Sequence, residues 1–228
     1  MSEKGTDYRY ERKFIVEGIS PQEVTQLVQL HPAMFYQPYP PRFVNNFYLD
    51  TLGMENYYDN VHGAANRVKV RVRWYGDLYR EVTKPVLEFK IKRGLVGTKQ
   101  QFKLPAMDTG KSFTGASYSA VLAQADLPEI VRERMQGLHI VLLNRYWRYY
   151  FATYDQRFRI TLDTALAFQR VDHQQNRFMH RQQNYRSFVM ELKYGVEQDD
   201  EANRISSYFP FRVDKSSKYV QGIERVYF

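Results

Sequence analysis

The feature that most constrains this chain of 228 residues is an alternation of charged and apolar side chains, which recurs in five segments. Alternate residues of a β-strand point to the same face of a sheet, so odd and even positions separate into two faces. Lysine and arginine with scattered carboxylates occupy one face, and mainly apolar or aromatic residues occupy the other. These segments begin near residues 8, 66, 86, 157 and 186.

The predicted strands are grouped along the chain and do not alternate regularly with helices. This grouping predicts an α+β fold with a mainly antiparallel sheet. The content of 19 Tyr and 15 Phe supports a strand-rich protein. A sheet of so many strands tends to curl. If it closes into a barrel, the charged face becomes a basic interior and the helices pack against the apolar outside.

Composition sets the remaining bounds. Hydrophobic residues make up 43% of the chain, which is enough for a sizeable core and excludes general disorder. We expect a single domain spanning residues 1–228. The absence of cysteine excludes disulfides and thiol catalysis. We find no apolar run long enough to span a membrane and no apolar signal region near the N-terminus, so we expect a cytoplasmic protein.

The charge balance indicates an anionic ligand. The net charge is +8, and basic residues at two-residue spacing on a strand repel each other unless an anion lies between them. An ordinary solvent-exposed sheet face is the plainer alternative. However, the charged face is dense in Lys and Arg. A polyanion with a divalent metal would neutralise it, since Arg and Lys bind phosphate oxygens and Glu binds the metal.

Nucleic-acid binding is the main rival from another functional class, because basic strands interleaved with aromatic residues can bind single strands. Such a surface does not need Glu11, Glu88 and Glu191 on the same faces as the cations. These carboxylates favour a metal–phosphate site, so we expect no nucleic-acid partner. The five histidines lack the spacing of a zinc site, and no Walker-type phosphate loop is present.

Eight segments, in order along the chain, resemble a known family. Residues 9–14 (RYERKF) resemble the opening strand of the VTC (vacuolar transporter chaperone) domain, the polyphosphate polymerase branch of the CYTH-like triphosphate tunnel superfamily. The other similar segments are 47–51 (FYLDT), 69–76 (KVRVRWYG), 87–90 (LEFK), 144–146 (NRY), 159–164 (RITLDT), 190–193 (MELK) and 216–219 (SSKY).

The resemblance implies an antiparallel β-tunnel of about eight strands that binds ATP, triphosphate or polyphosphate with Mn²⁺ or Mg²⁺. It implies a phosphotransferase that makes inorganic polyphosphate from ATP. A triphosphatase and a non-catalytic module that binds polyphosphate or nucleic acid remain alternatives. The implied catalytic residues are Arg71, Arg73, Arg159 and Lys90; the phosphate-binding residues are Arg9, Lys13, Lys99, Lys193, Ser217 and Lys218; the metal ligands are Glu191, Glu11 and Glu88.

One residue departs from the wider superfamily. Its triphosphatases and cyclases open with Glu-x-Glu-x-Lys, whereas Arg9 stands at the first position here. A guanidinium in place of a carboxylate removes a metal ligand and adds a phosphate ligand, which fits the polyphosphate branch better than a two-metal hydrolase. The chain has no membrane segment, so export of a product would require a partner protein.

Overall fold

The computed structural model describes residues 9–94, 96–110, 113–171, 178–184 and 187–228. The chain forms two compact units. The first comprises Met1–Arg42, Tyr146–Leu166 and Gln183–Ser216, and the second comprises Phe43–Arg145, Ala167–Gln182 and Ser217–Phe228. Two long strands, β8 (His139–Ala152) and β9 (Arg159–Val171), contribute residues to both units.

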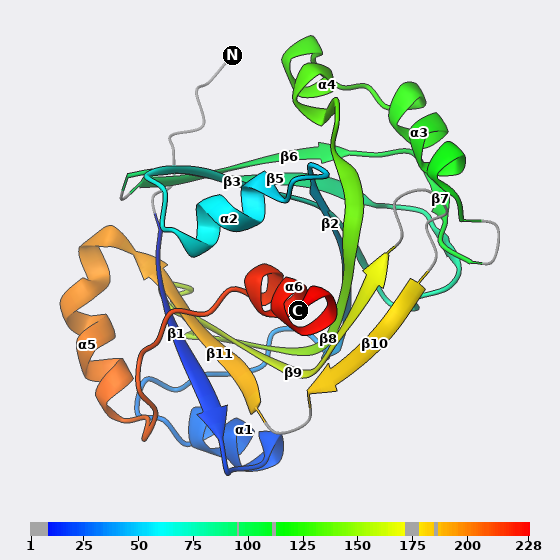
Figure 1. Ribbon diagram of the computed structural model, residues 1–228. Coiled ribbons are helices and arrows are strands. Elements are labelled where there is room, and N and C mark those ends of the chain that lie inside the picture. Colours follow the sequence, from blue (N-terminus) through cyan, green and yellow to red (C-terminus); the bar gives the residue numbers. More distant parts are fainter. Residues whose placement is uncertain (1–8, 95, 111–112, 172–177, 185–186) are drawn as a thin grey trace. The chain divides into compact units, whose positions relative to one another are not determined.

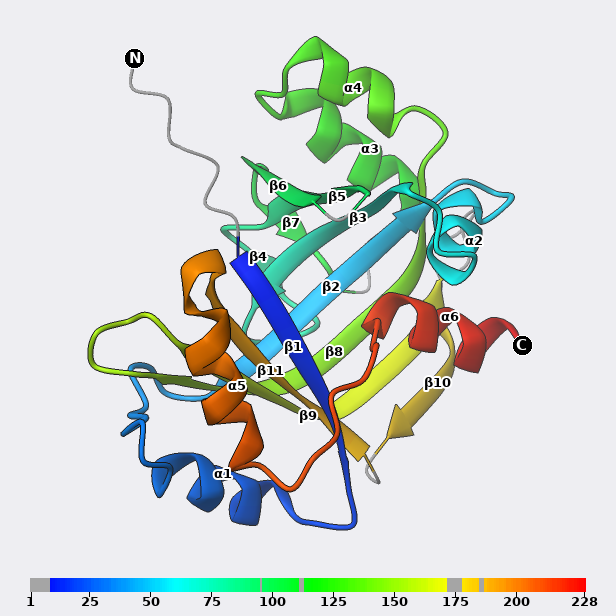
Figure 2. The same cartoon turned by 90° about the vertical axis from the view of Figure 1, so that its left-hand side faces the viewer.

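In the first unit, β1 (Arg9–Glu17) pairs antiparallel with β11 (Ser187–Gly195), and β11 pairs antiparallel with β9. Helices α1 (Pro21–Gln29) and α5 (Asp199–Ser207) lie beside these strands (Figure 2). The short 3₁₀ helix η1 (Val196–Gln198) precedes α5. Helix α1 begins as the sequence indicates, because Ser20 and Glu23 form a reciprocal capping box and Pro21 opens the first turn.

The second unit holds the strands β2 (Arg42–Asp50), β3 (Asn66–Tyr75), β5 (Val86–Arg93) and β6 (Val96–Lys103), which are adjacent in that order. Strand β8 pairs with β2, and β10 (Phe178–Asn184) pairs with β9. A small separate sheet joins β4 (Glu81–Val82) and β7 (Met107–Asp108). The remaining elements are the helices α2 (Glu55–Val61), α3 (Gly115–Gln124), α4 (Glu129–Met135) and α6 (Lys218–Tyr227).

The apolar face of the β3–β5 pair packs into the main core of the second unit. Val70, Val72, Leu87 and Phe89 are buried there together with Val131 of α4. Figure 1 shows α3 and α4 on one side of these strands and α2 and α6 on the other. The charged residues of β3 and β5 therefore point away from α3 and α4, as the alternation in the sequence predicts.

These observations confirm the predicted α+β class and the antiparallel sheet, whose main path runs β1-β11-β9-β8-β2-β3-β5-β6. Residues 178–184 form strand β10, which is not among the five alternating segments of the sequence. Polar residues suffice in β10 because pairing with β9 satisfies its backbone. Among the described helices, none is long and apolar enough to cross a membrane.

Candidate functional site

A basic cluster in the second unit is built on β3, β5 and β6. Their register places Lys69 opposite Lys90 and Lys90 opposite Lys99, and in the next row Arg71 lies opposite Glu88. Like charges directly opposite each other on neighbouring strands are destabilising. A row of three lysines across three strands therefore sacrifices stability, as expected of a surface built to bind an anion.

Glu88 organises the arginines of this basic cluster. Its side chain is only 3% exposed, and its Oε2 lies 2.6 Å from both Nε and Nη2 of Arg71 and 3.7 Å from Nη1 of Arg73. Its Oε1 lies 3.0 Å from Nζ of Lys99 and accepts a hydrogen bond of 2.7 Å from Gln101. Burial alone would raise the pKa of Glu88, but the three cations outweigh it and lower this pKa to about 2.

This arrangement suits a residue that orients its basic neighbours better than the metal ligand that the resemblance implies. Both carboxylate oxygens already accept contacts from basic or amide groups, so the side chain fixes the positions of the arginines. Arg73 is held further by Nε, which donates to Oδ1 of Asn46 at 3.0 Å. The basic cluster thus presents several cations around a single carboxylate, which is the composition that a phosphate chain requires.

The start of α6 lies against the basic cluster. Nζ of Lys69 donates to Oγ of Ser217 at 2.9 Å, and Ser217 also caps α6 by accepting from the backbone N–H of Val220. Two acceptor contacts leave the Ser217 hydroxyl hydrogen as a donor for an anion. Lys218, the first residue of α6, is buried, with 9% of its surface exposed. The two predicted phosphate ligands Ser217 and Lys218 therefore lie at the N-terminal end of α6.

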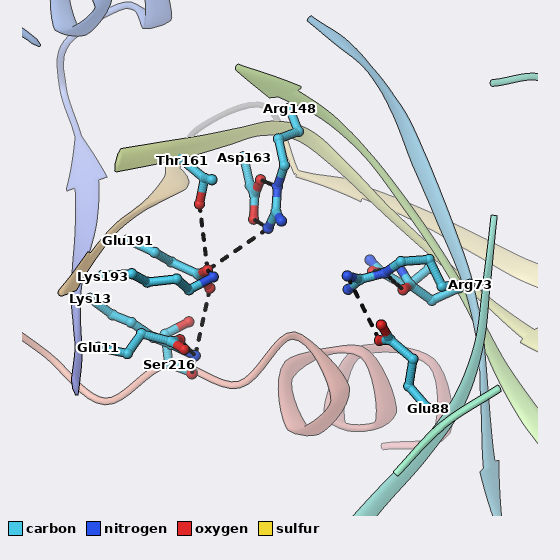
Figure 3. Close-up of polar contacts among 12 residues, drawn as sticks. Glu11, Lys13, Arg73, Glu88, Arg148, Thr161, Asp163, Glu191, Lys193 and Ser216 are labelled. Atoms are coloured by element: carbon cyan, nitrogen blue, oxygen red, sulfur yellow. Dashed lines mark hydrogen bonds and ion pairs between the residues drawn. The ribbon is translucent and has the colours of Figure 1, made fainter. Parts of the chain in front are cut away.

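A second cluster lies around Glu191 of β11 in the first unit, and the side chain of Glu191 is 7% exposed (Figure 3). We call it the acidic cluster after its carboxylates Glu11, Asp163 and Glu191. Its Oε2 contacts Nζ of Lys193 at 2.9 Å and accepts a hydrogen bond from Thr161 at 3.5 Å. Its Oε1 lies 3.7 Å from Nζ of Lys13 on β1, and the same ammonium lies 3.1 Å from Oε1 of Glu11. Two carboxylates from neighbouring strands therefore share one lysine.

Arg148 of β8 completes the acidic cluster. Its guanidinium binds Asp163 with two hydrogen bonds, of 2.5 and 2.6 Å, and its Nη2 lies 3.8 Å from Oε2 of Glu191. Burial opposes the charged form, but the Asp163 carboxylate raises the pKa of Arg148 well above its ordinary value. Our sequence prediction missed Arg148. Arg148 lies among the aromatic residues of β8, where charged and apolar residues do not alternate, although it shares a strand face with Asn144 and Tyr146.

The donor set of the acidic cluster fits a single Mg²⁺ or Mn²⁺ ion. Mg²⁺ is commonly held by one or two carboxylates together with substrate phosphates rather than by a full protein cage. Glu11 and Glu191 supply such a pair. Within the part of the chain that the structure describes, no group of three or more acidic or histidine side chains could hold a metal ion. Water and phosphate oxygens would complete the coordination.

Two other predicted phosphate ligands, Arg159 and Arg9, lie at the first positions of β9 and β1. Arg159 opens β9 opposite Lys193, is exposed, and has no hydrogen bond or ion pair among the described residues. The backbone of Arg9 begins β1, but its side chain lies outside the described part of the structure. The structure thus brings Glu11, Lys13, Glu191 and Lys193 together in one cluster and Arg71, Arg73, Glu88 and Lys99 in another.

Comparison with solved structures identifies the fold class. A candidate adenylate cyclase from Vibrio parahaemolyticus matches with a TM-score of 0.52 at 12% identity, over 94% of this chain and 98% of that one. A candidate adenylyl cyclase from Hippeastrum, described as revealing a dominant triphosphatase activity, matches with a TM-score of 0.53 at 13% identity, over 95% and 97%. The fold is that of the CYTH-like triphosphate tunnel proteins.

The family follows from the sequence. Residues 8–227 match the VTC domain, so this chain belongs to the VTC domain family. A search of curated proteins found no significant match. The family and fold together indicate a phosphate-related function, and CYTH-like tunnel proteins are typically enzymes that use divalent metals.

Proposed function

We propose that this VTC domain is a metal-dependent phosphotransferase that makes inorganic polyphosphate from ATP. The observation that carries the proposal is the basic cluster of the second unit, where Lys69, Lys90 and Lys99 form one row beside the Glu88-bound arginines. A phosphate chain carries regularly spaced negative charges. A row of ammonium groups across adjacent strands fits this spacing better than it fits the charge of a single small anion.

The proposed chemistry is in-line transfer of the terminal phosphoryl group of ATP to an oxygen of a phosphate or polyphosphate acceptor, with ADP leaving. That oxygen is already ionised, so the reaction needs no strong general base. Arg71 and Arg73 would neutralise the oxygens of the transferred group. The resemblance to the VTC domain gives the same role to Arg159 and a phosphate-binding role to Arg9, Lys13, Lys90, Lys99, Lys193, Lys218 and the hydroxyl of Ser217.

The acidic cluster would hold the divalent ion through Glu191 and Glu11, and the bound ion would supply additional neutralisation of phosphate charge. Arg148 orients Glu191 from the side opposite Lys13, because it is itself fixed by Asp163. These contacts hold the Glu191 carboxylate in one position before any substrate binds, which lowers the reorganisation needed during the reaction.

Hydrolysis of triphosphate is the second candidate. The related fold from Hippeastrum is described with a dominant triphosphatase activity, and the same groups would serve if water replaced the phosphate acceptor. Arg9 at the opening of β1 favours polymerisation over this candidate, because it replaces a metal-binding carboxylate with a phosphate-binding group.

Triphosphate binding by an Arg71→Ala/Arg73→Ala variant tests the basic cluster. Each charge-assisted hydrogen bond contributes on the order of 1.5–3 kcal/mol, so affinity for inorganic triphosphate should fall by roughly a hundredfold or more. Arg80→Ala is the matched control, since Arg80 is exposed and pairs only with Asp77 among the contacts described for it. Unchanged affinity in the double variant, with a normal circular dichroism spectrum, would refute the proposed role of the cluster.

A further inference from the structure

The ammonium of Lys13 occupies the position where a cation would bridge two carboxylates. It lies 3.1 Å from Oε1 of Glu11, 3.7 Å from Oε1 of Glu191, and donates to the backbone carbonyl of Ser216 at 2.8 Å. The register of β1 and β11 places Lys13 directly opposite Glu191. A single ammonium therefore interacts with both carboxylates.

The other oxygen of Glu191 is engaged on its far side. Lys193, Thr161 and Arg148 all approach Oε2, at 2.9, 3.5 and 3.8 Å. A divalent ion that uses both Glu191 and Glu11 must therefore approach their Oε1 atoms, which is the side that Lys13 holds. The ammonium and the ion cannot share this position, because both are cations and the gap is spanned by a single nitrogen.

We infer that Lys13 is an exchangeable internal cation that blocks the metal position until substrate phosphates draw it away. This inference rests on the proposed function, in which Glu191 and Glu11 bind metal and Lys13 binds phosphate. A lysine side chain is long and flexible and can exchange a carboxylate partner for a phosphate with little backbone movement. Metal and triphosphate would then bind with positive cooperativity. Triphosphate draws the Lys13 ammonium from the metal position, and the metal replaces this ammonium at the two carboxylates.

Direct Mn²⁺ binding to the protein without any phosphate, measured by electron paramagnetic resonance of the free ion, tests this inference. Wild type should bind Mn²⁺ weakly, and Lys13→Met should bind it at least about tenfold more tightly, since a unit positive charge within a few ångströms has been removed. Lys13→Gln should show the same gain while keeping a donor for the Ser216 carbonyl. Adding Glu11→Gln or Glu191→Gln to Lys13→Met should abolish the gain.

Lys193→Met is the matched control, because Lys193 contacts Glu191 only through Oε2 and does not bridge to Glu11 in the described contacts. It should tighten Mn²⁺ binding less than Lys13→Met. If the folded Lys13 variants bind Mn²⁺ no more tightly than wild type or than Lys193→Met, the inference that Lys13 blocks the metal position is contradicted. Metal-dependent turnover that survives Glu191→Gln would instead contradict the proposed function. A failure of the inference about Lys13 can therefore be distinguished from a failure of the proposed function.

Discussion

Two buried tyrosines in the second unit differ in the hydrogen bonding of their hydroxyl groups. The hydroxyl of Tyr118 is buried and has no hydrogen-bond partner among the described residues, whereas the hydroxyl of Tyr219 donates to the buried carboxylate of Asp50. Asp50 also accepts from the backbone N–H groups of Asn56 and Tyr57 at the start of α2. Tyr219 therefore links α6 to β2 and α2, and Tyr118 only fills space.

Replacing each tyrosine with phenylalanine should have opposite effects on stability. Tyr118→Phe removes an unsatisfied buried hydroxyl and should raise the free energy of unfolding by about 1 kcal/mol. Tyr219→Phe leaves the Asp50 carboxylate with one donor fewer and should lower it by roughly 1–3 kcal/mol. Urea denaturation of the two variants checks the pair, and a loss of stability in Tyr118→Phe would contradict the described environment of this hydroxyl.

Glu88 should make stability depend on pH in the acid range. Its pKa is lowered to about 2 in the folded protein, below that of an unfolded glutamate, because Arg71, Arg73 and Lys99 outweigh the effect of burial. A group with a depressed folded pKa stabilises the protein above its unfolded pKa, and this contribution is lost as the pH falls toward the folded value. The stabilisation should therefore disappear between about pH 4.5 and pH 2.

Glu88→Gln keeps the shape of the side chain and removes its charge. The variant should be less stable than wild type at pH 7, by an amount on the order of 3 kcal/mol, and nearly as stable near pH 2. Unfolding free energies measured across this range provide the check. Parallel curves for the variant and wild type would show that Glu88 is not held by the three cations.

Helix α6 depends on a close approach at Gly222. A Cβ atom at this position would lie 2.5 Å from Cδ2 of Leu142 and 2.7 Å from Cδ1 of Phe168. The glycine therefore allows the helix backbone to pack directly against these side chains of β8 and β9. Because Ser217 and Lys218 stand at the start of the same helix, this packing also sets the position of two proposed phosphate ligands.

Gly222→Val should destabilise the protein by roughly 1–3 kcal/mol through overpacking, despite the poor helix propensity of glycine. It should also weaken triphosphate binding, because the start of α6 would shift. Glu224→Ala, an exposed change on the same helix, is the control and should leave both quantities nearly unchanged. If Gly222→Val is as stable as this control, α6 does not pack as described.

Alternation in the sequence predicted the strands and the faces they present, as the charged positions of β3 and β5 show. It also predicted that the charged residues share one face of the sheet, where strand pairing brings neighbours such as Arg71 and Glu88 together. The odd or even position of a residue cannot show which carboxylate oxygen faces which cation. It therefore did not predict that Glu88 would be engaged by three cations or that Lys13 would lie between two carboxylates. Those contacts depend on strand register, which the sequence does not specify.

For the whole molecule, the two units have different charge character. In the second unit, Arg71, Arg73 and Lys99 lie against the carboxylate of Glu88, and Lys69, Lys90 and Lys99 form one row across β3, β5 and β6. The first unit places two carboxylates around Lys13. We expect the basic cluster to bind phosphates, and we expect Glu11 and Glu191 to bind the divalent ion while Lys13 and Lys193 bind phosphate.

The most direct test of this account is incubation of the purified protein with ATP and Mn²⁺, following polyphosphate chain length on a gel together with free phosphate. The account predicts chains that grow with time in wild type and fail to form in Glu191→Gln. Release of phosphate without chain growth would contradict polymerisation and establish a triphosphatase. If no chains and no free phosphate form while triphosphate still binds, catalysis by the domain is contradicted. The domain would then be a binding module.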